Sequence, residues 1–296
     1  MNMPLVGRVE QTLRAEIAAP VRALAATLGR EAEASAVLFY GSNLRTGALD
    51  GVLDFYVLTP GPAERGIWPT VSYREVAIGG VTLRAKIATM RLATFRKAAD
   101  GDTIDTTIWT RFVQPSALAW AATPTDKRAV INAVAAAAIT ASRYAAALGP
   151  DAGPADAFWR ALFRATYAAE LRVERPGREE QLLANGQQHF AALLPLAWAA
   201  DGQPFEQGHG RMRPLIDAED REEVRRSWRR RQRLGRPLNL LRLTKAAFTF
   251  DGAARYGAWK IERHTGVPVP LTPWRERHPL LAAPAVLWRV WRAARS

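Results

Sequence analysis

The sequence predicts an α+β protein in three parts: a mixed β-sheet domain over residues 1–122, a mostly helical domain over 123–215, and a basic helical segment over 216–296. Two observations support this division. Short apolar runs bounded by turn residues, which are typical of strands, lie before residue 90, and longer periodic apolar segments, which are typical of helices, follow them. Positive charge is concentrated in the last quarter of the chain.

The first domain is expected to begin with an amphipathic helix over residues 5–29, broken near Pro20. Four strands follow, the last two paired as a hairpin around Gly79-Gly80. They are predicted at 35–40, 52–58, 71–77 and 81–88. A helix begins within 89–99, and residues 103–121 are expected to form a second helix that stops near Pro115.

The rest of the chain is expected to be helical, apart from a polar, glycine-containing loop over residues 201–215. Gly149-Pro150 and Pro176-Gly177 mark helix ends. The predicted helices are 125–148, 154–174, 178–194 and a very basic one over 217–234.

Composition excludes several classes of site. The chain has no cysteine, so disulfides, thiolate metal sites and cysteine nucleophiles are ruled out, and a reducing cytosol is the compartment that this composition fits. Charged residues such as Glu10 and Arg14 interrupt any apolar run near the N-terminus, so no signal peptide is expected. No uncharged apolar stretch reaches about 18 residues, so no transmembrane helix is expected either. The four histidines are expected on the surface or in loops.

One stretch carries most of the chemical information. An apolar strand runs into Gly41-Ser42, and Asp54 lies on the next apolar strand, with eleven residues between Ser42 and Asp54. Glycine lets the backbone approach a phosphate closely, and serine with nearby N–H groups supplies donors. Carboxylates on the next strand, Asp54 and more weakly Asp50, would hold a divalent metal that neutralises the phosphates. This order predicts the nucleoside triphosphate site of a nucleotidyltransferase-like domain.

The alternative interpretation of the motif is a tight turn between two strands, with Asp50-Gly51 as a second turn. The usual metal pair is Asp-x-Asp, because side chains two apart on a strand share a face. Here Tyr56 occupies the second position. Asp50 shares a face with Asp54 only if the strand already runs straight at that point.

The sequence resembles the mitochondrial-type phosphatidate cytidylyltransferases, the peripheral CDP-diacylglycerol synthases, over about residues 35–120. The matching motifs are Tyr40-Gly41-Ser42, Leu53-Asp54-Phe55 and the segment Thr110-Arg-Phe-Val-Gln-Pro115. Asn43 stands where the family has a glycine after Gly-Ser.

This resemblance implies a Mg²⁺-dependent reaction in which the phosphate of phosphatidate attacks the α-phosphate of CTP, giving CDP-diacylglycerol and pyrophosphate. Asp54, Asp50 and Lys86 are then the candidate catalytic residues, with both aspartates as metal ligands. The candidate nucleotide-binding residues are Gly41, Ser42, Arg84 and Arg111.

The auxiliary cations have structural alternatives. Arg84 and Lys86 lie two apart on a predicted strand, so they share a face and can grip a triphosphate, or they can belong to a solvated strand face. Arg111 together with Gln114 is a candidate contact for nucleotide or lipid phosphate.

The residues from Arg221 to the C-terminus hold 18 Lys/Arg and 5 Asp/Glu and therefore account for the whole net charge of +13. Aromatic residues are interspersed, and near the end Leu287, Trp288 and Trp291 share one face while Arg289, Arg292 and Arg295 recur on another. This pattern is typical of a helix lying on an anionic membrane. The alternatives are a helix packed on the body of the protein, or contact with nucleic acid.

The resemblance therefore implies a cytidylyltransferase that uses CTP and phosphatidate, and the basic, aromatic pattern predicts its peripheral attachment to the cytoplasmic face of the inner membrane through residues 216–296. Two alternatives stay open. One is a nucleotidyltransferase that acts on RNA or another acceptor, and the other is a non-catalytic membrane or nucleic-acid adaptor on the same fold.

Overall fold

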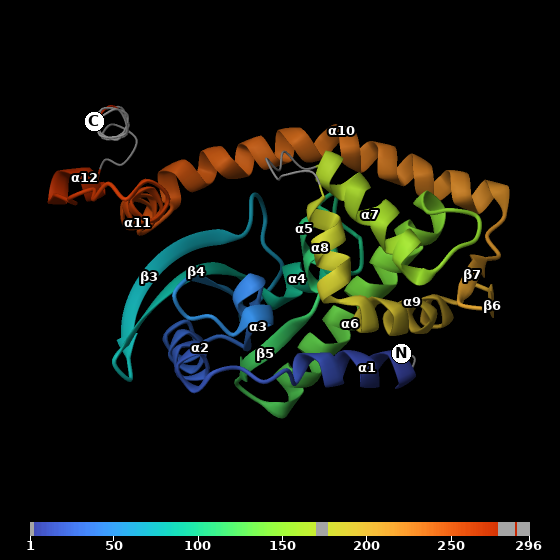
Figure 1. Cartoon of the computed structure of the whole chain (residues 1–296), viewed down its shortest axis with the longest axis horizontal. Helices are drawn as coiled ribbons and strands as arrows, with labels where there is room; N and C mark the ends of the chain where they lie inside the picture. Colours follow the sequence, from blue (N-terminus) through green and yellow to red (C-terminus); the bar gives the residue numbers. More distant parts are fainter. Residues whose placement is uncertain (1–2, 170–176, 278–287, 289–296) are drawn as a thin grey trace.

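The computed structural model describes residues 3–169, 177–277 and 288, and shows an α+β protein built on a mixed five-stranded sheet (Figure 1). The strand order is β3-β4-β2-β1-β5. The strands are β1 (Ala36–Tyr40), β2 (Val52–Thr59), β3 (Thr70–Ile78), β4 (Val81–Arg91) and β5 (Ser116–Ala121). Strand β2 is parallel to β4, and the other neighbouring pairs are antiparallel.

Helices cover both faces of this sheet and form most of the remaining chain. The first part holds α1 (Met3–Leu13), α2 (Ala19–Glu31), α3 (Ser42–Thr46), α4 (Leu92–Ala99) and α5 (Thr107–Phe112). The second holds α6 (Pro124–Leu148), α7 (Ala155–Ala169), α8 (Arg178–Asn185), α9 (Gln187–Asp201) and the hairpin β6 (Phe205–Gly208)–β7 (Arg211–Pro214). The last holds α10 (Ala218–Thr249), α11 (Ala253–Thr265) and α12 (Pro273–Arg277).

The two faces of the sheet bury different clusters because side chains alternate along each strand. Leu53, Phe55 and Val57 of β2 face α2. Tyr56 and Leu58 face the opposite way, into the larger core formed with the helices. Asp54 shares this second face by alternation, but it lies at the end of the strand where the apolar helices do not reach. The fold thus leaves one end of this face polar.

Helix α6 is the central helix of the larger core. It begins with a side-chain cap, in which the Thr123 hydroxyl accepts from the Asp126 N–H at 3.1 Å. Among the described residues it is the one helix long and apolar enough to cross a membrane. However, 72% of its apolar window is buried inside the protein. Its alanine-rich surface therefore serves close packing with the sheet and the surrounding helices.

A single core joins the three parts that the sequence suggested. Trp109 of α5, Tyr144 of α6 and Trp228 of α10 pack together, with ring centroids 5.2 Å apart between Trp109 and Tyr144 and 5.5 Å between Tyr144 and Trp228. Trp228 is only 3% exposed. The basic segment therefore contributes to the same buried cluster as the sheet, and Figure 1 shows α10 running along one side of the whole molecule.

The predicted break near Pro20 is confirmed: residues 5–29 form two helices, and Pro20 lies in the first turn of the second, α2. Four other predicted elements differ from the structure. The basic helix expected over 217–234 continues to Thr249 as α10. The helix expected over 103–121 is the short α5 followed by β5, an antiparallel partner of β1. The helix expected over 178–194 is divided at Gly186, where a Cβ would collide with the Phe190 ring. The loop expected over 201–215 contains the β6–β7 hairpin.

Candidate functional site

Gly41 and Asp54 meet at the polar end of the sheet. Strand β1 ends at Tyr40, which is paired with Asp54 of the antiparallel strand β2. Gly41 has φ +95° and ψ −163°, a region that is essentially restricted to glycine. A Cβ at Gly41 would lie 3.0 Å from Asp54 Oδ2. Asp54 therefore lies close to Gly41, so the fold brings these two residues of the motif together.

Strand β4 brings two cations to the same face. In the parallel register Lys86 is opposite Asp54, and Arg84 is opposite Val52. On the other side of β4, Glu75 of β3 is opposite Arg84 and forms an ion pair with it at 3.5 Å. The Tyr73 hydroxyl also donates to Glu75 at 2.7 Å. The structure thus places Arg84 and Lys86 beside Asp54 rather than on a separate solvated face.

Arg111 reaches this group from α5. Its Nη1 donates to the Tyr56 hydroxyl at 2.9 Å, and its guanidinium lies over the rings of Tyr40 and Tyr56 at 5.2 and 5.6 Å. Burial raises the pKa of Asp54, and the charges of Lys86 and then Arg111 oppose that rise. Two cations thus compensate a partly buried carboxylate, and residues from three separate segments form one electrostatic group.

Asp50 is placed differently from Asp54. Strand β2 begins at Val52, so Asp50 lies in the bend before it and not on the strand face. Its side chain is 77% exposed and pairs with Arg263 of α11 at 3.5 Å. Tyr56 lies at the position where Asp-x-Asp would have its second acid. Its side chain is buried, and its hydroxyl accepts a hydrogen bond from Arg111. The structure therefore brings Asp54 to the polar face without a second aspartate from β2.

Ser42 and the connection after it form the rim of the site. Ser42 is exposed and begins α3, and its hydroxyl donates to the Asn43 side-chain carbonyl at 3.3 Å. The Asn43 amide in turn donates to the Ala48 carbonyl at 2.8 Å and packs against Gly51. Asn43 stands where the resembled family has a glycine. Its hydrogen bond to Ala48 stabilises the connection between β1 and β2.

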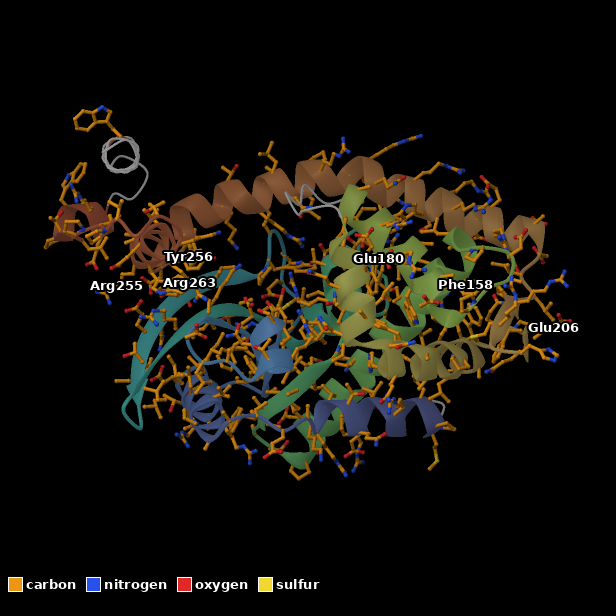
Figure 2. The ribbon with its side chains drawn as sticks, in the orientation of Figure 1. Phe158, Glu180, Glu206, Arg255, Tyr256 and Arg263 are labelled. Carbon is orange, nitrogen blue, oxygen red and sulfur yellow. The ribbon has the colours of Figure 1, made fainter. Side chains whose placement is uncertain are left out.

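Helix α11 adds residues that the sequence assigned to a membrane segment. Tyr256, Trp259 and Arg263 recur at helical spacing on the side of α11 that faces the sheet, and Figure 2 shows Tyr256 and Arg263 between α11 and the strands. Arg84 lies over the Trp259 ring at 5.5 Å. The aromatic and basic pattern of this stretch was visible in the sequence, but its proximity to β4 depends on the path of α10.

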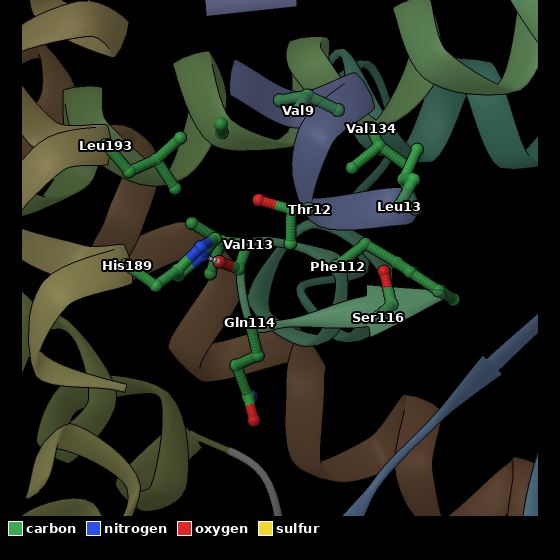
Figure 3. Close-up of a pocket in the computed structure, with 11 residues that line it drawn as sticks. Val9, Thr12, Leu13, Phe112, Val113, Gln114, Ser116, Val134, His189 and Leu193 are labelled. Carbon is green, nitrogen blue, oxygen red and sulfur yellow. Dashed lines mark hydrogen bonds between the residues drawn. The ribbon is translucent and has the colours of Figure 1, made fainter. Parts of the chain in front are cut away.

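Gln114, which was expected to act with Arg111, lies elsewhere. It lines a small cavity of about 10 Å³ between α1, α5, α6 and α9, shown in Figure 3, and its amide donates to the Thr110 carbonyl. His189 lines the same cavity and bonds the Val113 carbonyl through Nε2 at 2.8 Å. His189 was expected on the surface or in a loop, but it is on α9 with its ring turned inward. The cavity is separate from Asp54.

The donor set at the polar face fits a magnesium ion that arrives with a nucleotide. Among residues 3–169, 177–277 and 288, no cluster of three or more His, Cys, Asp or Glu could hold a metal ion. Mg²⁺, however, is commonly bound by one or two carboxylates together with substrate phosphates and water. Asp54 supplies one carboxylate, and the adjacent cations match phosphate oxygens.

No family model matches this chain, and no curated protein matches it. The residues around Asp54 are therefore the basis for assigning a function.

Proposed function

We propose that this protein is a nucleotidyltransferase that transfers CMP from CTP to phosphatidate, giving CDP-diacylglycerol and pyrophosphate. The observation that carries the proposal is the close approach of the Asp54 carboxylate to Gly41, at which a Cβ would lie 3.0 Å from Asp54 Oδ2, together with the nearby charges of Lys86 and Arg111. A carboxylate for a metal and cations for phosphates, arranged around a backbone without a side chain, are what a triphosphate site needs. The choice of CTP and phosphatidate rests on the resemblance in the motifs.

Each residue has a defined part in this reaction. Asp54 would hold Mg²⁺, which when bound neutralises the phosphate oxygens of the nucleotide. Gly41 lets the triphosphate approach the backbone, and the exposed Ser42 hydroxyl can donate to a phosphate oxygen. An oxygen of the phosphatidate phosphate forms a bond to the α-phosphorus as the bond to the β-phosphate oxygen breaks. Lys86 and Arg111 stabilise the negative charge on the transferred group and on the departing pyrophosphate.

An insoluble acceptor requires a surface that meets the membrane, and α10 offers one. Several arginines that the sequence assigned to this surface are instead used inside the protein. Arg231 is 7% exposed and donates to the carbonyls of Gly101 and Thr103, and Arg225 donates to the Ala147 carbonyl. The outer face keeps exposed arginines next to exposed leucines. It consists of Arg226, Arg230, Arg233, Leu234, Leu240 and Leu241.

We call these six residues the outer face of α10 and propose that they contact the anionic cytoplasmic leaflet of the inner membrane. Leu234, Leu240 and Leu241 are 44, 59 and 54% exposed, which is a large apolar area for one helix face in water. Arginine and leucine side by side fit the headgroup region and the acyl boundary. The predicted helix around Trp291 lies outside the described residues, and Trp288 is 59% exposed.

The proposal is tested by incubating the purified protein with CTP labelled in the α-phosphate, Mg²⁺ and vesicles that contain phosphatidate. We expect label in the lipid extract, and we expect Asp54→Asn to reduce its rate by at least about 100-fold, because a charge-stabilising group at the reacting phosphate is lost. Asp102→Asn, which changes an exposed acid on the loop after α4, is the matched control.

Two results would redirect the assignment. Transfer of label to RNA and not to lipid would indicate another acceptor for the same site. Undiminished lipid labelling by Asp54→Asn would remove Asp54 from the reaction and contradict the proposal.

A further inference from the structure

Helix α11 is fixed to the edge of the sheet at its first turn. Asp251 forms a parallel bridge with Ser72 of β3, and the Tyr73 N–H donates to the Asp251 carbonyl at 2.8 Å. Gly252 has φ +79°, and a Cβ there would collide with the Tyr73 carbonyl oxygen. The chain after α10 thus joins β3 closely enough to require glycine, and α11 starts from a defined point beside the polar face.

From this anchor, α11 directs two aromatic side chains toward the site. The Tyr256 ring lies 5.3 Å from that of Tyr73. Burial raises the pKa of Tyr256, and the charge of Asp54 adds to that rise. One turn further along α11, two guanidinium groups lie over the Trp259 ring. The distance from the guanidinium carbon to the ring centroid is 5.5 Å for Arg84 and 5.2 Å for Arg263.

These two arginines have weak acidic partners. Arg84 pairs with Glu75 at 3.5 Å, and that carboxylate also accepts the Tyr73 hydroxyl. Arg263 donates to the Asp50 main-chain carbonyl at 2.9 Å, while its distance to the Asp50 carboxylate is 3.5 Å. The Arg263 side chain is 46% exposed, so part of its guanidinium fork is open to a ligand. An ion pair of 3.5 Å is longer than a strong charge-assisted hydrogen bond, so both guanidinium groups could bind a better-placed anionic acceptor.

The charges on the side of α11 that faces the sheet favour an anion. Among the described residues, their contacts place five cations and three carboxylates there. The cations are Arg84, Lys86, Arg111, Lys260 and Arg263, and the carboxylates are Asp50, Asp54 and Glu75. A metal held by Asp54 would increase the positive excess. Arginine forks held on an aromatic ring match phosphate oxygens in geometry as well as in charge.

We propose that α11 is the second wall of the nucleotide site, and that Arg84 and Arg263, both held on Trp259, bind the two phosphates that leave as pyrophosphate. The identity of the ligand rests on the proposed function. The nucleotide is then enclosed between the sheet and α11, with its α-phosphate at Asp54. The C-terminal segment is thereby part of the catalytic domain as well as a route to the membrane.

The test measures binding of pyrophosphate with Mg²⁺ to the full chain by isothermal titration calorimetry, without acceptor or turnover. We expect Arg263→Gln to weaken binding about 10- to 100-fold, the range for losing a hydrogen bond to a charged group. Arg263→Lys keeps the charge but loses the fork, so it should lie between the two. Trp259→Leu removes the common support of both arginines and should weaken binding to a similar extent.

Arg128→Gln, which removes an exposed arginine from the first turn of α6, is the charge-matched control and should bind as the wild type does. Melting curves of each variant establish that it is folded, and the partial exposure of Arg263 makes it the least disruptive change. Equal affinity in the wild type, Arg263→Gln and Trp259→Leu overturns the role of α11, as does the absence of binding to the wild type.

The labelling experiment separates this inference from the proposed function. CMP transfer without any effect of Arg263→Gln on pyrophosphate affinity would leave the reaction standing and remove α11 from it. Pyrophosphate binding that depends on Arg263, in a protein that transfers no CMP, would leave the anion site standing and remove the reaction.

Discussion

At the scale of single residues, the site depends on a backbone conformation that one residue type permits. Gly41 combines a positive φ with contact to Asp54 Oδ2, so both its strain and its position are specific to glycine. The neighbouring Gly47 also has a positive φ, +69°, but a Cβ there would meet nothing within 4 Å. The two glycines differ in what surrounds them, which makes them a matched pair.

We expect Gly41→Ala to lower the unfolding free energy by about 1–3 kcal/mol, the range for a residue forced into a sparsely populated backbone region, and to displace the Asp54 carboxylate. Gly47→Ala should lower stability by about 1 kcal/mol and leave Asp54 in place. Urea denaturation gives the two stabilities, and titration with CTP and Mg²⁺ gives the affinities. Equal nucleotide affinity in the two variants would contradict the importance of the contact.

His189 gives the protein a specific dependence of stability on pH. Burial lowers the pKa of His189, and its Nδ1 has no hydrogen-bond partner in the structure. The unfolded chain therefore takes up this proton at a higher pH than the folded protein does. The unfolding free energy should fall as the pH decreases below about 6.5, the ordinary pKa of histidine.

His189→Gln is expected to reduce the slope of unfolding free energy against pH between pH 7 and pH 5, because the group that titrates only in the unfolded state is gone. His209→Gln, a change at an exposed residue of the β6–β7 turn, is the control and should keep the wild-type slope. Denaturant midpoints across this pH range measure both. A slope unaffected by His189→Gln would show that other groups govern the acid response.

At the scale of elements, α10 secures α5 through a buried ion pair. Arg242 of α10 pairs with Asp105, and their side chains are 15 and 3% exposed. Asp105 also accepts from the Thr107 N–H at the start of α5, and Arg242 lies over the Trp68 ring at 4.6 Å. Arg111 lies on α5, four residues after Thr107. Together with Lys86, it is one of the two cations whose charge opposes the rise in the pKa of Asp54. A contact from the basic helix thus fixes the helix that carries a site residue.

Arg242→Ala should lower the unfolding free energy by about 3–5 kcal/mol, because removing one partner leaves a buried, uncompensated carboxylate. Arg128→Ala changes an exposed arginine and should stay within about 0.5 kcal/mol of the wild type. Guanidinium denaturation followed by tryptophan fluorescence measures both. A loss below about 1 kcal/mol would contradict a stabilising role for this ion pair.

At the scale of the whole molecule, α10 connects the two halves and offers one side to the surroundings. Its inner face packs on α6 and α7, with Trp228 and Arg231 against Tyr144 of α6, while its outer face stays exposed. Figure 1 shows that α10 passes over both the helical part and the sheet, so a membrane along it would lie beside α11 as well. The same helix therefore packs on the core and, in the proposed function, contacts the membrane.

We expect Arg230→Gln combined with Arg233→Gln to weaken binding to anionic vesicles about 30-fold, since each basic residue near such a surface contributes about 1 kcal/mol. Both side chains are exposed, so the melting temperature should stay unchanged. Vesicle sedimentation at fixed ionic strength measures the partition. Tight binding by this double variant would place the membrane surface elsewhere on the protein, and binding to RNA that falls in parallel would favour a nucleic-acid partner.

The sequence by itself determined the class of fold and the local origin of the site. Short apolar runs bounded by turn residues predicted four of the five strands of the main sheet, and the Gly-Ser motif followed by Asp54 marked the end of β1 and the start of β2, because such patterns are visible within short stretches of sequence. The tertiary structure decided what lies opposite that end. β5 has the composition of a short apolar segment and becomes a strand by pairing with β1. The arginines of α10 and α11 lie in the core, at the site or on the surface, according to the neighbours that the folded chain provides. Such contacts join residues up to 213 positions apart, as between Asp50 and Arg263, and no local pattern encodes them.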